Sequence, residues 1–187
     1  MIPTPPLRAR NRLAETVLAA LHDAGARRRL QALAEDAEAA EAWLGPDRAR
    51  HGEVLRRRVR QAAAALAGLP VLPAPPSLAE ALGAAAALFD AGLGFEVHEL
   101  LEPFWAQATG PRRRALQGLI QIAVGYQHLA NGNVGGAGAL LEEGAARVAG
   151  QRLEGLDLDA FGRAVRAWLV RRHEEGPAPI PPFPRRG

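Results

Sequence analysis

The chain has 187 residues, enough for one sizeable domain, and its 48% apolar fraction is that of an ordinary soluble globular protein. It contains no Cys and no Lys, which excludes disulfides, thiolate catalysis, Schiff-base chemistry and a P-loop lysine. The abundant Ala and few aromatics favour an all-α fold, a compact multi-helix bundle with an N-terminal helical extension.

Three amphipathic helical patterns open the chain and form the expected extension, residues 1–68. We expect the breaks between them at Gly25 and Gly45. Residues 69–76 are rich in Pro and therefore predict an extended linker.

Residues 77–175 form the expected core domain, which opens with a capping box. In the sequence Ser77-Leu78-Ala79-Glu80, the Ser hydroxyl and the Glu carboxylate can satisfy free N–H groups at a helix start. The last helix of the domain is expected to begin at Asp157 as its N-cap. The glycine breaks and the apolar periodicity place the other helices, which are expected to cover about 77–89, 95–107, 112–131 and 137–148.

Residues 176–187 form a Pro-rich tail that ends in Arg185, Arg186 and a glycine. We expect this tail to be extended or disordered. Its polyproline character would alternatively let it dock on an aromatic groove.

The stretch 115–141 carries no Asp, Glu, Lys or Arg and must be considered as a membrane span. Its glutamines, asparagines, His128 and glycines make it too polar and too broken for a helix facing lipid. We therefore expect no membrane association and a cytoplasmic location.

The segment 95–105 concentrates three carboxylates and a histidine between Phe95 and Trp105. Within it, His98 and Glu102 lie one helical turn apart. A helix face rich in charge is usually only a solvated face. The two bracketing aromatics would be poorly placed in solvent, and they favour a functional site.

The long helix expected at 112–131 carries a polar stripe on an otherwise apolar surface. Gln117, Gln121, His128 and Asn131 fall within about 80° of one another on the helical wheel. A helix that is apolar nearly all round is central in a fold, and buried amides without partners cost about 1–3 kcal/mol each. The stripe must therefore find partners or line a cavity.

Three glycines, Gly118, Gly125 and Gly132, recur every seven residues beside this stripe. Because glycine inside a helix costs about 1 kcal/mol relative to Ala, their spacing predicts close approach of another helix. Gly132 and Asn133 also predict a turn.

Two blocks of sequence resemble a known family. The segment 89–99 (FDAGLGFEVHE), followed by Glu102 and Trp105, and the segment 116–121 (LQGLIQ), followed by His128, resemble domain of unknown function family 309. The resemblance covers about 77–148 and implies a compact all-helical fold, but it implies no activity.

The chain departs from the family pattern at three positions. Asp90 stands where the family usually has Asn, and Gly94 replaces a usual aromatic, so we expect Gly94 to open the wall of the site. Pro103 removes a hydrogen bond within the motif helix and is expected to kink it.

These patterns lead us to expect a small polar ligand in a Glu/His/Gln-lined cleft between two core helices. No cofactor is predicted, although a divalent metal is a lesser alternative with His98, Glu99, Glu102 and His128 as ligands. The usual di-metal spacing is Glu-x-x-His, whereas the order here is His-Glu-x-x-Glu. The full set of candidate ligand-binding residues is Glu96, His98, Glu99, Glu102, Trp105, Gln117, Gln121, His128 and Asn131.

Other interpretations stay open. The polar residues could form a closed structural network in a scaffold or protein-interaction domain. Arg triplets at 27–29, 56–58 and 112–114 could bind nucleic acid, but they lack interleaved aromatics, so a solvated face is favoured. The sequence does not decide between an enzyme and a binding protein, and a homodimer is left open.

Overall fold

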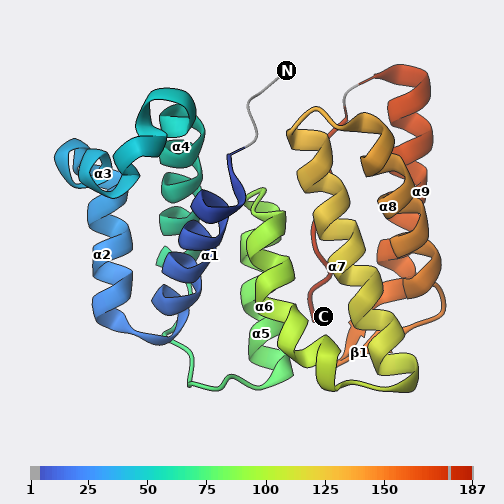
Figure 1. Cartoon of the computed structure of the whole chain (residues 1–187). Helices are drawn as coiled ribbons and strands as arrows, with labels where there is room; N and C mark the ends of the chain where they lie inside the picture. Colours follow the sequence, from blue (N-terminus) through green and yellow to red (C-terminus); the bar gives the residue numbers. More distant parts are fainter. Residues whose placement is uncertain (1–4, 177, 187) are drawn as a thin grey trace.

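The helices form two groups that lie side by side in the computed structural model (Figure 1). The structure describes residues 5–176 and 178–186. Helices α1 to α4 form one group, and α5 to α9 form the other, so the predicted all-α fold is confirmed. The elements are α1 (Leu7–His22), α2 (Ala24–Glu35), α3 (Ala37–Leu44), the 3-10 turn η1 (Gly45–Asp47), α4 (Arg48–Ala67), α5 (Leu78–Asp90), α6 (Gly94–Gln107), α7 (Gly110–Ala130), α8 (Val134–Val148), β1 (Arg152–Leu153), β2 (Leu156–Asp157) and α9 (Leu158–Glu175).

The first group contains one more helix than the sequence pattern indicates. The expected second helix is divided at Asp36, whose carboxylate accepts the Glu38 N–H at 2.8 Å and caps α3. Asp23 caps α2 in the same way, by accepting the Ala26 N–H. Aspartate N-caps therefore set both boundaries: near Asp23 we had expected Gly25 to act, and at Asp36 we had expected no break.

The linker and the start of α5 follow the expected design. The Leu72 N–H donates to the Leu21 carbonyl at 2.8 Å and ties the extended linker to α1. The capping box is confirmed, because the Glu80 N–H donates to Ser77 Oγ at 3.3 Å and the Ser77 N–H donates to Glu80 Oε2 at 2.7 Å.

Helices α7 and α8 approach each other closely through glycine. A Cβ atom at Gly118 would lie 2.6 Å from Val148 Cγ1, and one at Gly144 would lie 2.8 Å from the Gly118 carbonyl oxygen. Gly125 meets Leu141 of α8 at a similar separation of 2.8 Å. The predicted close contact is therefore confirmed for Gly118 and Gly125, whereas Gly132 has a φ of +82° and makes the turn before α8.

The C-terminal part is more ordered than expected. Asp157 caps α9 as predicted, since its carboxylate accepts the Ala160 N–H at 2.9 Å. Residues 178–186 contain no helix or strand, in keeping with an extended tail, but they lie against the core, with Phe183 only 2% exposed. The reason is an aromatic pocket that receives Phe183, formed in part by Phe89 and Phe161.

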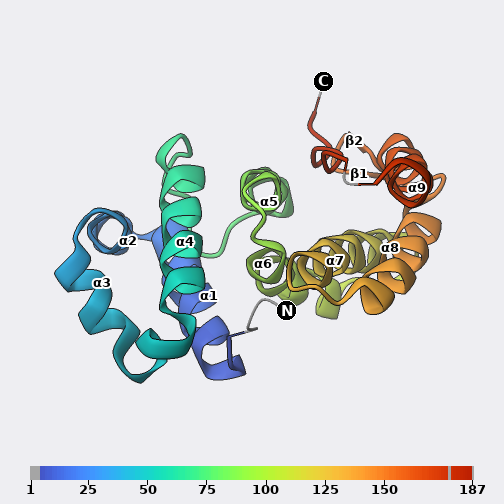
Figure 2. The same ribbon diagram turned by 90° about the horizontal axis from the view of Figure 1, so that it is seen from above.

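One hydrophobic core draws on both groups of helices. It includes Leu13 and Leu55 from the first group, and Leu101, Leu119 and Val165 from the second. Seen from above in Figure 2, α5 and α6 lie between the first group and α7 to α9. Within the described residues, no helix combines the length and the apolar character that a membrane span requires.

Candidate functional site

Helix α6 is held tightly against α7 at its first residue. A Cβ atom at Gly94 would lie 2.2 Å from the Ala123 carbonyl oxygen, closer than any side chain tolerates. We had expected Gly94 to open the wall of a pocket, but its role is different. It lets the start of α6 contact the α7 backbone, which fixes the direction in which the following side chains project.

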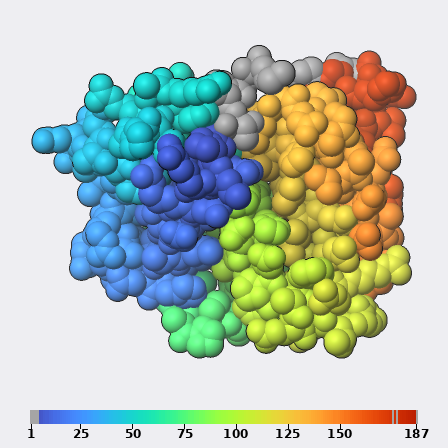
Figure 3. Space-filling view, in the orientation of Figure 1, coloured from blue at the N-terminus to red at the C-terminus, as the bar shows by residue number. Residues whose placement is uncertain are grey.

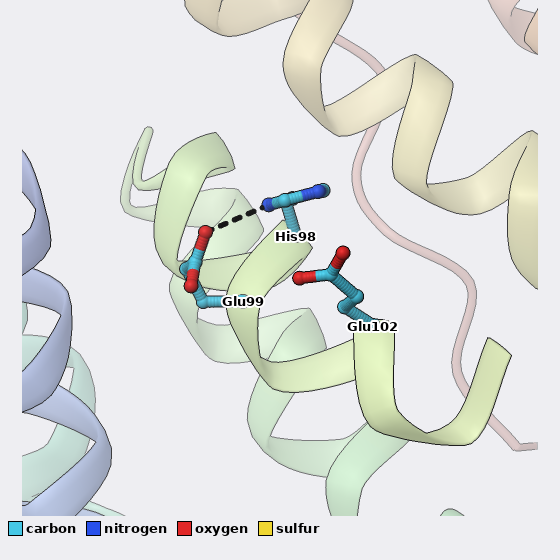
Figure 4. A group of neighbouring side chains, drawn as sticks. All are labelled: His98, Glu99 and Glu102. Carbon is cyan, nitrogen blue, oxygen red and sulfur yellow. Dashed lines mark hydrogen bonds and ion pairs between the residues drawn. The ribbon is translucent and has the colours of Figure 1, made fainter. Parts of the chain in front are cut away.

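Three potential metal ligands gather on α6. His98, Glu99 and Glu102 each offer one ligand atom, and these atoms lie within 4.8 Å of one another. Figure 4 shows the three side chains projecting from the same part of the helix. The His98 and Glu99 side chains are 29% and 33% exposed, and Glu102 is exposed, so the cluster opens to solvent.

Glu99 holds the imidazole ring of His98 in place. Its Oε1 lies 3.0 Å from His98 Nδ1, which leaves Nε2 free of this interaction. On its other side the ring stacks on Phe95, with centroids 6.0 Å apart and planes at 27°. The Arg10 guanidinium of α1 lies 5.1 Å from the Phe95 centroid, so the first group of helices reaches the edge of the site.

Glu96 is separated from this cluster and points into the protein. It is 0% exposed, and neither carboxylate oxygen has a hydrogen-bond partner among the described residues. Burial raises the pKa of Glu96, and the positive charge of Arg58 opposes this change. Arg58 of α4 is itself 5% exposed, and burial lowers its pKa while Glu96 opposes the shift.

Arg58 is therefore an important residue that the sequence did not reveal. It lies in an Arg triplet that we interpreted as a solvated face, and only the docking of α4 near α6 brings its charge to Glu96. The signal in the sequence was Val59, the apolar residue directly after Arg58, which indicates that this turn of the helix faces the protein interior. In the structure Val59 is 2% exposed.

The polar stripe of α7 is largely engaged with α8 and the turn before it. Gln121 donates to Glu143 Oε2 at 2.9 Å and accepts from Arg147 Nε at 2.7 Å. His128 Nδ1 lies 3.0 Å from Asn133 Nδ2, which belongs to that turn.

The candidate residues thus fall into two sets, one on α7 and one on α6. Asn131 accepts from the buried Gln127 at 3.2 Å, and Gln117 is half-buried on α7. Among the residues that the structure describes, His128 does not belong to the group of metal ligands on α6. The cluster on α6 is the set whose ligand atoms converge in the open.

Trp105 lies at the far end of α6, where α7 begins. The Arg113 guanidinium stacks over its ring at 4.0 Å from the centroid and donates to the Trp105 carbonyl at 2.9 Å. The indole Nε1 is buried without a partner among the described residues. These contacts give Trp105 a part in joining α6 to α7.

Comparison with known proteins supports a family relationship for part of the chain. No curated protein and no solved structure matches the chain. A family model described as "Domain of unknown function (DUF309)" matches residues 82–140, which include all of α6 and α7. This match confirms the resemblance seen in the sequence, and the similarity to the family is shown for this segment of the chain.

Proposed function

We propose that this protein binds a small polar ligand at the His98, Glu99 and Glu102 cluster, and that a divalent cation holds the ligand there. One observation carries the proposal: the ligand atoms of these three side chains converge to within 4.8 Å on one exposed face of α6. Imidazole nitrogen with carboxylate oxygen is a donor set that suits Zn²⁺ and related transition metals.

The details of the cluster fit a site with an open position. A metal-ligating histidine commonly shares its other ring nitrogen with a carboxylate, which fixes the ring and increases its basicity. Glu99 has this relation to His98, so His98 Nε2 and Glu102 would be direct ligands. Three protein groups or fewer leave coordination positions for water or for a polar ligand, as in catalytic rather than structural zinc sites.

The proposal is tested by calorimetric titration of untagged protein with ZnCl₂. Removing a direct ligand by His98→Ala or Glu102→Gln should abolish measurable binding. Glu99→Gln should weaken the affinity by about 10-fold to 100-fold, as expected for a group that orients a ligand.

Glu53→Gln is the matched control, because Glu53 is an exposed carboxylate on α4 and should bind Zn²⁺ as the wild type does. Thermal melts would verify that each variant is folded. Unchanged Zn²⁺ affinity in folded His98→Ala protein would contradict the proposal.

A further inference from the structure

The C-terminal segment 178–186 occupies a groove in the second group of helices. It lies beside α9 and the β1–β2 hairpin (Figure 2). The Trp168 indole N–H donates to the Ala178 carbonyl at 3.0 Å. An indole donor facing a carbonyl of an extended Pro-rich segment is how aromatic grooves grip polyproline ligands.

Phe183 is the anchor of the segment. It is 2% exposed, and its ring centroid lies 5.3 Å from that of Phe89 and 5.8 Å from that of Phe161. Its backbone N–H donates to Asp90 Oδ1 at 2.9 Å. The groove thus offers an aromatic pocket with a carboxylate at its rim.

The Asp90 carboxylate also binds a positively charged residue further along the segment. Asp90 Oδ2 accepts from the Arg185 guanidinium, so Asp90 contacts both the anchor residue and the arginine two positions later. Arg186 donates through Nε to the Glu154 carbonyl at 2.8 Å. An acidic rim therefore complements the basic end of the segment.

Much of the segment makes little contact. Pro179 and Pro182 are exposed, and Ile180 is 45% exposed. The segment is held by one aromatic anchor, two ion pairs at the surface and a few bonds to main-chain atoms, without strand pairing or a helix of its own. A ligand held by so few contacts can be exchanged.

The groove is also larger than the segment that occupies it. A cavity of about 280 Å³ remains beside Pro184, Arg185 and Arg186, and α5 contributes Ala79, Leu82, Gly83 and Ala86 to its lining. A Cβ atom at Gly83 would meet nothing within 4 Å. Packing therefore does not require a glycine at this position of the helix. The absence of a side chain at Gly83 enlarges the cavity.

We propose that this groove recognises a Pro-rich segment of a partner protein, with the chain's own tail as its internal competitor. The partner segment carries Phe for the aromatic pocket and Arg two residues later for Asp90. An apolar residue after the arginines fills the cavity over Gly83. The proposal is independent of the cation site on α6.

The test measures fluorescence anisotropy of a labelled peptide with the sequence of residues 178–186, titrated with the full-length protein. Phe183→Ala removes the internal anchor and should bind the peptide at least about tenfold more tightly than wild type, because the site is then vacant. The peptide in which Phe is replaced by Ala should not bind. A peptide extended by one Leu should bind about tenfold more tightly than the original, since burying Leu is worth a factor of that order.

Two controls keep the result interpretable. Ile180→Ala alters an exposed tail residue, so its affinity for the peptide should equal that of wild type. If Phe183→Ala does not fold, Arg185→Glu, which changes a surface ion pair, should give the same order of affinities with a smaller gain. Folded Phe183→Ala that binds the peptide no better than wild type, or binds both peptides equally, would overturn the proposal. Slow dimer formation by wild type, blocked by the free peptide, would identify the tail of a second copy as the partner.

Discussion

Two titratable residues two positions apart on α6, Glu96 and His98, have opposite surroundings. Glu96 is fully buried near the charge of Arg58, whereas His98 and Glu99 are about one-third exposed. On a helix, a step of two residues turns the side chain by about 200°, so neighbours in sequence can serve unrelated purposes. Glu96 lies in the interior, where its charge interacts with that of Arg58 in the first group of helices, and the other residues offer ligand atoms to solvent.

Glu96 should make stability depend on pH. Because burial raises its pKa in the folded state, the folded protein binds this proton more strongly than the unfolded chain does. The free energy of unfolding should therefore fall as pH rises from the ordinary carboxyl value of 4.5 toward the raised pKa. The slope from this one group is at most about 1.4 kcal/mol per pH unit.

Glu96→Gln should remove that contribution. Urea unfolding of wild type and variant at a series of pH values measures the difference between their slopes, in which the other titrating groups cancel. Only the slopes are compared, and not the free energies of unfolding themselves, because the variant also deprives Arg58 of a compensating charge. Parallel pH profiles for the two proteins would show that Glu96 is not held protonated.

The residues of the cation cluster could be identified from sequence because their spacing places them on adjacent positions of one helix. The interactions of Glu96 and Gln121 could not, since Arg58 and Glu143 come from other helices whose docking no local pattern describes. Asp90 is similar: its partners, Phe183 and Arg185, lie more than 90 positions away in the chain.

At the scale of the helices, glycine has different roles at different positions. Gly94 of α6 has no room for a Cβ atom beside the Ala123 carbonyl, whereas Gly83 of α5 faces open space. The first glycine permits a contact between two helices, and the second only lowers the helix propensity of α5. Their effects on stability should therefore have opposite signs.

The matched pair of variants is Gly94→Ala and Gly83→Ala. The first should destabilise the protein by about 1–3 kcal/mol because α6 must move away from α7. The second should stabilise it by about 0.5–1 kcal/mol. Urea denaturation at one pH measures both free energies of unfolding, and effects of the same sign would refute this assignment of roles.

Most helix boundaries could be predicted because Ser77, Asp157 and the glycine turns mark them locally. The division between α2 and α3 could not, since Asp36 lies among Glu and Ala residues and the apolar period continues across it. An aspartate at this point of the sequence can lie on the solvent-facing side of a continuous helix or cap the start of a new one. Only the path of the backbone distinguishes these two roles.

At the scale of the whole molecule, the two groups of helices share one core. Leu72 of the linker bonds to α1, and Arg10 of α1 lies over Phe95 of α6. The space-filling view shows the first group in continuous contact with α6 along one face (Figure 3). The sequence predicted an N-terminal helical extension joined by a Pro-rich linker, but that linker carries no information about how the extension docks.

We therefore expect the chain to unfold in one cooperative transition. Urea curves followed by far-UV circular dichroism and by tryptophan fluorescence should coincide, since Trp43 lies in the first group while Trp105 and Trp168 lie in the second. An early fluorescence transition that disappears in Trp43→Phe would instead show that the first group unfolds independently.

The metal content of untagged protein purified without chelator shows whether α6 carries a cation site. Mass spectrometry should find about one divalent metal ion per chain in wild type, as for a single open site, and loss of that metal in the His98→Ala/Glu102→Gln double variant. Glu53→Gln should retain it. Equal metal content in wild type and in the folded double variant, or none above the buffer level in wild type, would contradict the account.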